Sequence, residues 1–182
     1  MTKSSNKSCS QASNGPTKLI KKDQVEKNKK YSKFQYRDQV FQIGDSCKFW
    51  MGDKHGDVMG KILGICTTDQ KHPDFGKLNV AWYYFKNELD FKTLGLKQKE
   101  QDAIAEHQEI FLTNHTDKVW VQSINAKIEI LSLEEFDKLS VVPPTSYLCR
   151  ADYDVKKIVL KPPFNKWGGR SCSCNMPTNP LQ

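Results

Sequence analysis

The chain has 182 residues, of which 37% are hydrophobic and 27% charged, a composition typical of a globular core flanked by polar segments. No apolar stretch approaches the roughly 18 residues that a membrane-spanning helix needs. The polar start of the chain also lacks the apolar segment of a secretion signal. We therefore expect neither a membrane partner nor secretion.

The net charge of +7 is concentrated near the N-terminus. Residues 1–40 contain ten basic and three acidic side chains, which accounts for the whole excess. Residues 1–30 are rich in Ser, Asn, Lys and Gln and have almost nothing to bury, so they are predicted to form a disordered basic arm. Such arms often bind nucleic acid, which predicts non-specific DNA contact; a purely solubilising tail is the alternative.

Short apolar runs from residue 41 onward predict β-strands. We expect a turn and a strand over residues 42–49, a loop over 51–57 and a second strand over 58–66, whose glycines mark bends or a bulge. The strongest strand is predicted over 77–85, where β-branched and aromatic residues are dense.

The second half of the chain continues this pattern. Residues 86–108 are polar, with a short helix predicted over 96–106, and strands are predicted over 109–113, 118–121, 124–131, 147–150 and 158–160. Ser132 and Glu135 form a capping box that starts a short helix, and Pro143 follows its end. Many short strands with irregular connections predict a mainly β fold, a small twisted barrel with short helices.

Known catalytic motifs are absent from the sequence. It contains no phosphate-binding glycine loop, no Gly-x-Ser-x-Gly and no His-Glu-x-x-His. Cys47, Cys66 and Cys149 lie in apolar surroundings and are expected to be core thiols in a reducing compartment. We therefore expect that the chain is not an enzyme.

The order of four sequence runs resembles the BAH (bromo-adjacent homology) domain: FQIGD at 41–45, GKILGI at 60–65, VAWYY at 80–84 and EIFLTNHTD at 109–117. INAKIEI at 124–130 and YLCRADY at 147–153 resemble the rest of that domain, so the resemblance spans about residues 36–160. On this basis the BAH domain is placed at residues 31–165.

The resemblance implies a methyl-lysine cage at Trp82 and Tyr84. Trimethyl-lysine is a cation without hydrogen-bond donors, and aromatic faces hold it. Residues i and i+2 of a strand share one side, so Trp82 and Tyr84 are expected on one face and Tyr83 is expected to point inward. The alternative is that these are ordinary core aromatics.

Two further elements of the implied site are less regular. The third cage wall falls at Val58, which is not aromatic, and Phe49 or Trp50 are candidate replacements. His115 and Asp117 are expected in a loop after residues 109–113, where the resemblance implies hydrogen bonds to the peptide beside the methylated lysine. The alternative is an exposed histidine and an aspartate that satisfies the loop backbone.

A second resemblance lies at the C-terminus. The run SCSCNMPTNP at 171–180 is similar to the opening of a PHD finger, with Cys172 and Cys174 as the first zinc ligands. Residues 166–182 are therefore interpreted as a linker and a truncated finger. A zinc site needs four ligands, so we expect no cofactor in this chain, and zinc only in a complete finger. An incidental cysteine pair is the alternative.

The order of BAH domain and PHD finger resembles a plant and fungal family that reads Polycomb-type methylation, trimethylated lysine 27 of histone H3. This resemblance implies a nuclear chromatin reader with a role in repression, and it implies the histone H3 tail, the nucleosome and other chromatin proteins as partners. Two alternatives remain: a BAH domain that acts as a protein–protein scaffold, and a DNA or nucleosome binder that depends on the basic arm.

Overall fold

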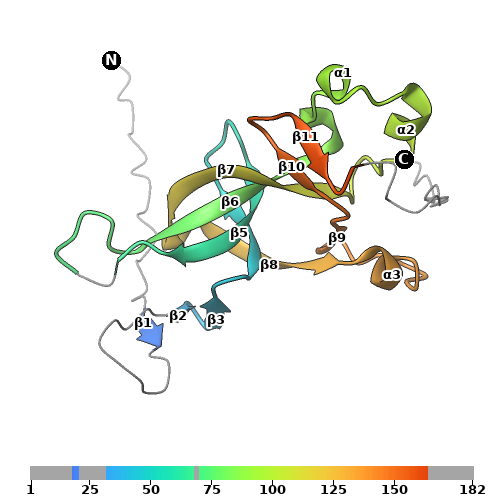
Figure 1. Cartoon of the computed structure of the whole chain (residues 1–182). Helices are drawn as coiled ribbons and strands as arrows, with labels where there is room; N and C mark the ends of the chain where they lie inside the picture. The colour runs from blue at the N-terminus through green and yellow to red at the C-terminus, as the bar shows by residue number, and fades with distance from the viewer. Residues whose placement is uncertain (1–17, 21–31, 68–69, 164–182) are drawn as a thin grey trace, which may run out of the picture.

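The computed structural model describes residues 18–20, 32–67 and 70–163 (Figure 1). They form a mainly β fold with a few short helices, as predicted. The strands are β1 (Lys18–Ile20), β2 (Lys33–Tyr36), β3 (Gln39–Gln42), β4 (Ser46–Trp50), β5 (Asp57–Ile65), β6 (Lys77–Phe85), β7 (Ile110–Trp120), β8 (Ile124–Leu131), β9 (Ser146–Leu148), β10 (Asp152–Asp154) and β11 (Val159–Lys161). The helices are α1 (Phe91–Leu94), α2 (Gln98–Asp102) and α3 (Leu133–Phe136), with 3-10 turns at Lys86–Glu88 and Val121–Ser123. Within these ranges, no helix is long and apolar enough to cross a membrane.

The larger sheet curls into a barrel. Its strands follow the order β11-β10-β7-β6-β5-β4-β8-β9. A parallel bridge between Glu109 and Leu148 brings β9 back to the beginning of β7, and the Leu148 amide donates to the Gln108 carbonyl at 2.8 Å. The strands from β7 round to β9 therefore enclose an interior, and this closure protects their edges.

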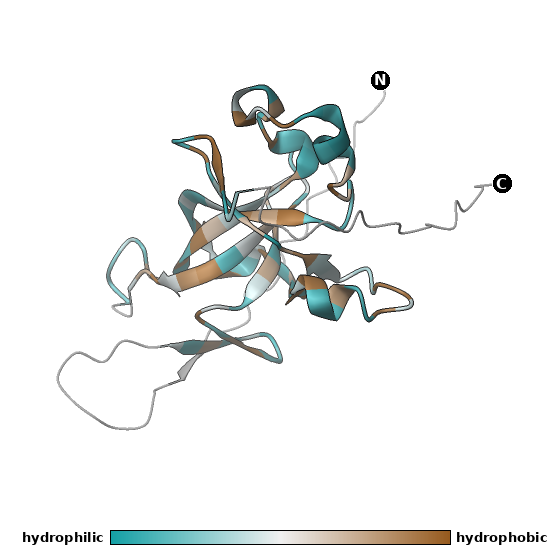
Figure 2. Cartoon of the chain, turned by 45° about the vertical axis from the view of Figure 1, so that its right-hand side comes forward, coloured by the Kyte–Doolittle hydropathy of each residue, from teal (hydrophilic) through white to brown (hydrophobic). Residues whose placement is uncertain are grey.

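Alternate residues of these strands fill the interior of the barrel, and Figure 2 shows hydrophobic and hydrophilic residues alternating along the strands. The buried interior cluster consists of Met59, Tyr83, Ile110, Ile128 and Tyr147. The Tyr83 hydroxyl makes a hydrogen bond of 2.9 Å with Ser46 Oγ, and burial raises the pKa of Tyr83 to about 12. The prediction that Tyr83 points inward is confirmed.

The smaller sheet, in the order β1-β2-β3, contributes to a second core on the other face of the barrel wall. Phe34 and Phe41 stack with ring centroids 5.4 Å apart, and they belong to one buried cluster with Val80 and Trp82. Residues 18–20 pair with β2 as strand β1. These residues fall within the arm of 1–30 for which disorder is predicted, and the backbone of β2 offers them hydrogen bonds. The rest of 1–30 lies outside the described residues.

The helical segment before β7 is built from short helices with local caps. The helix predicted over residues 96–106 is α2, at Gln98–Asp102, and α1 was not predicted. Asp90 caps α1 by accepting from the Thr93 amide at 3.1 Å. The capping box of Ser132 and Glu135 is confirmed at the start of α3.

β7 differs most from its prediction. Residues 110–120 form one strand, whereas the sequence predicted two strands separated by a loop. The polar residues 114–117 stay extended because β6 is long enough to pair with β7 as far as Trp120, and neighbouring strands override local propensity. β10 was also missed: it is short and polar, and it is held between β11 and β7.

Candidate functional site

The structure brings the four polar and aromatic site residues of β6 and β7 into one chain of polar contacts. Trp82 Nε1 donates to Asp117 Oδ2 at 2.7 Å, and His115 Nε2 lies 3.3 Å from the same oxygen. The Tyr84 hydroxyl lies 3.0 Å from His115 Nδ1. We call Tyr84, His115 and Asp117, which lie at the surface, the edge site.

A bulge in β7 places His115 in this chain. Ala81 pairs with Thr116 and Tyr83 with Leu112, so three residues of β7 stand opposite Trp82 alone. The Thr113 hydroxyl fixes the bulge: it donates to the Trp82 carbonyl at 2.8 Å and accepts from the His115 amide at 3.1 Å. His115 and Asp117 thus lie on a strand and not in a loop, and a bulge is a common device for redirecting side chains.

Asp117 is the acceptor that links the site to the core. A carboxylate can only accept, and the Trp82 indole N–H donates to it. His115 Nε2 lies within ion-pair distance of the same oxygen, and the Tyr84 hydroxyl shares a hydrogen bond with His115 Nδ1 whose direction depends on the tautomer of the imidazole. Partial burial raises the pKa of Tyr84, which keeps its hydroxyl protonated.

Trp82 lies beneath the site and is buried. Trp82 is only 4% exposed, and its ring packs edge-on against Phe49 with centroids 5.7 Å apart. Gly60 of β5 pairs with Trp82, and a Cβ at Gly60 would contact Val80 and would come within 3.0 Å of the indole. The prediction that Trp82 shares a face with Tyr84 is confirmed, because both contact the same cluster. A cage wall needs an exposed ring face, but the indole of Trp82 is buried, because Gly60 leaves room for it to pack into the core.

Tyr84 is the aromatic ring that reaches a surface hollow. It is half-buried, with its ring centroid 6.1 Å from that of His115 and 6.2 Å from that of Tyr153. The hollow measures about 370 Å³ and is lined by Tyr84, Asn114, His115, Thr116, Val155 and Lys156. Val155 and Lys156 follow β10, which the sequence did not predict, so no pattern in the sequence indicated this side of the hollow.

Val58, the expected third wall, lies two residues before Gly60 and therefore on the same face of β5. Gly60 is the first residue of β5 that pairs with β6, where it faces Trp82. Val58 is half-buried and packs against the cluster that Tyr84 contacts. Phe49 pairs with Val58 but is fully buried, so it cannot replace the missing wall. Trp50 is exposed, but as the neighbour of Phe49 in β4 it points to the opposite face.

The cysteines of the described residues are free thiols, and within this part of the chain no cluster of His, Cys, Asp or Glu could hold a metal ion. Cys47 is fully buried, and burial raises its pKa to about 12, as expected for a core thiol. Cys66 and Cys149 are only partly buried. Cys172 and Cys174, the expected first ligands of a zinc finger, lie outside the described residues.

Comparisons with known proteins agree with this architecture. The family model of the BAH domain matches residues 39–163. Among solved structures, the yeast Rsc2 BAH domain superposes with a TM-score of 0.51 at 15% sequence identity, over 72% of this chain and 53% of that chain. This chain therefore corresponds to about half the length of that protein chain, and the likeness is one of fold. No curated protein sequence matches. With its family match over more than half its length and the same fold in a solved relative, the chain belongs to the BAH domain family, whose domains are non-catalytic modules associated with chromatin.

Proposed function

We propose that this BAH domain is a nuclear chromatin reader that binds a methylated histone tail at the edge site. The observation that carries the proposal is the chain of polar contacts through Tyr84, His115 and Asp117 beside a hollow of about 370 Å³. It combines an aromatic face with a fixed carboxylate. A methylated lysine is drawn to both, because each attracts a cation.

The three residues have separate roles in this proposal. The Tyr84 ring contacts the methylammonium group. Asp117, which is 54% exposed at its side chain, attracts the basic tail, and His115 hydrogen-bonds the peptide next to the methylated lysine. Trp82 acts from below as a positioning residue, since its indole N–H orients the Asp117 carboxylate.

The resemblance to Polycomb-type readers makes trimethylated lysine 27 of histone H3 the first peptide to test, with repression as the proposed outcome of binding. Tyr84 is one exposed wall, and an exposed cation–π contact contributes about 0.5–1 kcal/mol. We therefore expect the trimethylated peptide to bind only about two- to fivefold more tightly than the unmodified peptide.

Calorimetric titration of both peptides into matched variants tests the proposal. Tyr84→Leu should remove the preference for the methylated peptide, whereas Tyr84→Phe keeps the ring and should keep the preference. Asp117→Asn should weaken both peptides, while Asp137→Asn, which removes a similar exposed charge near α3, should weaken neither. Preserved methyl preference in Tyr84→Leu would contradict the proposal.

A protein–protein scaffold is the second candidate function. It is favoured by the burial of Trp82 and by the aliphatic Val58, which leave the cage with fewer exposed rings than the resemblance implies. If the unaltered chain binds neither peptide, or binds both equally, the scaffold function replaces the reader.

A further inference from the structure

β5, β6 and β7 present a second surface on the face opposite Trp82 and Asp117. Lys61 pairs with Ala81, and Ala81 with Thr116; Asn79 pairs with Lys118; Lys77 pairs with Trp120. Directly paired residues project to the same side of a sheet. We call the residues Lys61, Lys77, Lys118 and Trp120 the lysine face.

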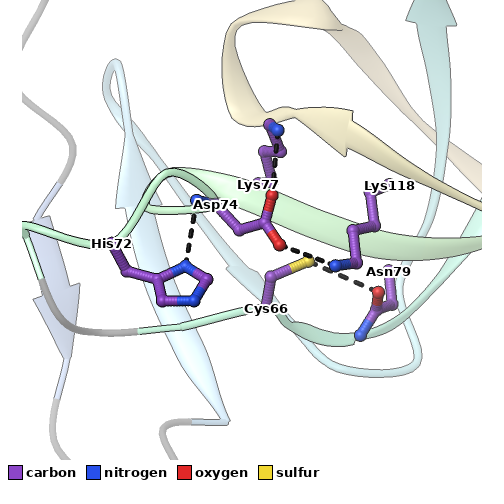
Figure 3. A network of polar contacts seen from close by, with 6 residues as sticks. All are labelled: Cys66, His72, Asp74, Lys77, Asn79 and Lys118. Atoms are coloured by element: carbon purple, nitrogen blue, oxygen red, sulfur yellow. Dashed lines mark hydrogen bonds and ion pairs between the residues drawn. The ribbon is translucent and has the colours of Figure 1, made fainter.

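Positive charge on the lysine face is held in a fixed arrangement. Asp74, in the loop between β5 and β6, accepts from Lys77 at 2.9 Å and from Lys118 at 2.6 Å (Figure 3). These ammonium groups lower the pKa of Asp74 to about 2, so it stays ionised and holds the two lysines side by side. Two ammonium groups thus share one carboxylate, which leaves a net positive charge, and Lys61 adds a further lysine to the same face of the sheet.

A hollow of about 500 Å³ lies on the lysine face. It is lined by Leu63, Asn79, Thr116, Asp117 and Lys118. The Cys66 thiol donates to Asn79 Oδ1 at 3.3 Å (Figure 3), which fixes the amide so that its NH₂ group remains a donor. The carboxylate of Asp117 is turned to Trp82 and His115. Neutral donors next to a lysine are the groups that bind phosphate oxygens.

Trp120 borders this surface and is 50% exposed. The Lys77 ammonium lies 4.8 Å from the centroid of its ring, so the indole makes a cation–π contact with Lys77. The lysine face is therefore cationic, with two exposed apolar side chains beside it, Trp120 and Leu63. Its lysines make it complementary to a polyanion.

We propose that the lysine face binds the phosphate backbone of duplex DNA. Alternation along β7 supports this: His115 and Asp117 project toward the edge site, whereas Thr116 and Lys118 project toward the lysine face. In a nucleosome the DNA is wrapped on the histones, so histone tails and DNA lie close together. The two faces of β7 would then be directed to a histone tail and to the nearby DNA. This inference goes beyond the proposed histone reading and does not depend on it.

The test uses the full chain and a short labelled DNA duplex, with affinity measured over a series of salt concentrations. The triple variant Lys61→Gln, Lys77→Gln, Lys118→Gln keeps the side-chain stems but removes three charges. We expect weaker binding and a plot of log affinity against log salt that is shallower by about 3, one unit for each lost phosphate contact. The basic N-terminal arm is present in every variant, so its contribution cancels.

A matched control removes the same charge elsewhere. The variant Lys54→Gln, Lys92→Gln, Lys138→Gln changes three exposed lysines outside the lysine face and should leave the salt dependence unchanged. An equal loss in both triple variants, or no loss in the first, overturns the proposal. Binding restricted to single-stranded DNA and abolished by Trp120→Leu also overturns it, because base stacking would then be the mode of binding.

The same variants separate this inference from histone reading. The lysine-face triple variant should retain its affinity for the histone peptide, and Tyr84→Leu should retain its affinity for the duplex. Loss of duplex binding in Tyr84→Leu would contradict the claim that the edge site and the lysine face bind independently.

Discussion

Trp82 and Tyr84 lie on the same face of β6, but only Tyr84 reaches the hollow. The difference arises from their partners across the sheet. Trp82 stands beside Gly60, which has no side chain to hold the indole away from the sheet, whereas Tyr84 lies where the ladder with β5 has ended. A single glycine thus turns a candidate binding residue into a core residue that supports Asp117.

At this scale the geometry predicts a gain of function. Val58→Tyr places an aromatic ring beside the cluster that Tyr84 also contacts and should rebuild a second exposed wall. One added cation–π contact of about 0.5–1 kcal/mol should raise the preference for a trimethylated peptide by a further two- to fivefold. Peptide titration measures this, with Val58→Leu as the control for side-chain volume. No gain in Val58→Tyr would show that position 58 does not face the methylated lysine.

β7 is the element that organises both proposed surfaces. Its bulge at residues 113–115 directs His115 toward Tyr84, and beyond the bulge its pairing with β6 carries Lys118 and Trp120 onto the lysine face. Extended backbone imposes this division, because successive side chains project to opposite sides.

The hairpin of β5 and β6 provides a pH-dependent prediction. The pKa of Asp74 falls from 3.8 to about 2 in the folded chain because Lys118 and Lys77 donate to it. A carboxyl group whose pKa is lower in the folded than in the unfolded chain stabilises the fold at pH values above its unfolded pKa. That stabilisation is lost as the pH falls toward the folded pKa. Asp74→Asn should therefore have a smaller free energy of unfolding than the unaltered chain above about pH 4, and the difference in free energy should disappear near pH 2.

Urea denaturation of the two proteins at several pH values measures the difference in their free energies of unfolding. Added salt should reduce this difference at neutral pH, because Lys118 is 56% exposed at its side chain and exposed charges are screened. A difference that stays constant down to pH 2 would show that Asp74 stabilises the hairpin through its shape and not through its charge.

Across the whole molecule, closure of the barrel depends on a buried ion pair. Arg150 donates to both carboxylate oxygens of Glu109, at 2.7 and 2.6 Å, and to the Ala103 carbonyl at 3.1 Å. Glu109 also accepts from the Ala105 amide at 3.0 Å, and the two side chains are 5% and 0% exposed. The pair joins β9, the start of β7 and the segment after α2.

Breaking this pair should destabilise the fold strongly. Arg150→Met leaves the Glu109 carboxylate buried without its cation, which costs about 3–5 kcal/mol. Adding Glu109→Gln should recover part of that loss, since a neutral amide can still accept from Ala105. Thermal or urea unfolding of the single and double variants measures both effects. If the double variant is no more stable than Arg150→Met, the buried charge is not the cause of the loss.

Local patterns in the sequence determined most of the strands. The run over 77–85 predicted β6 at its observed bounds, and the capping box predicted α3, because β-propensity, alternation and capping act between near neighbours. The residues of the edge site were also identified from sequence, through the resemblance to BAH domains. The resemblance placed them in the chain but did not show which of them reach the surface.

Contacts between distant segments decided the rest. The polar run at 114–117 has the composition of a loop, and only its pairing with β6 makes it a strand. Likewise, the sequence position of Trp82 suggests a cage wall, but its packing against Gly60 and Phe49 buries the ring. Cross-strand register determines both outcomes, and register joins residues that lie far apart in the sequence. The sequence by itself therefore determined the elements and the candidate residues, whereas the tertiary structure decided which side chains lie at the surface and which face of β7 each one occupies.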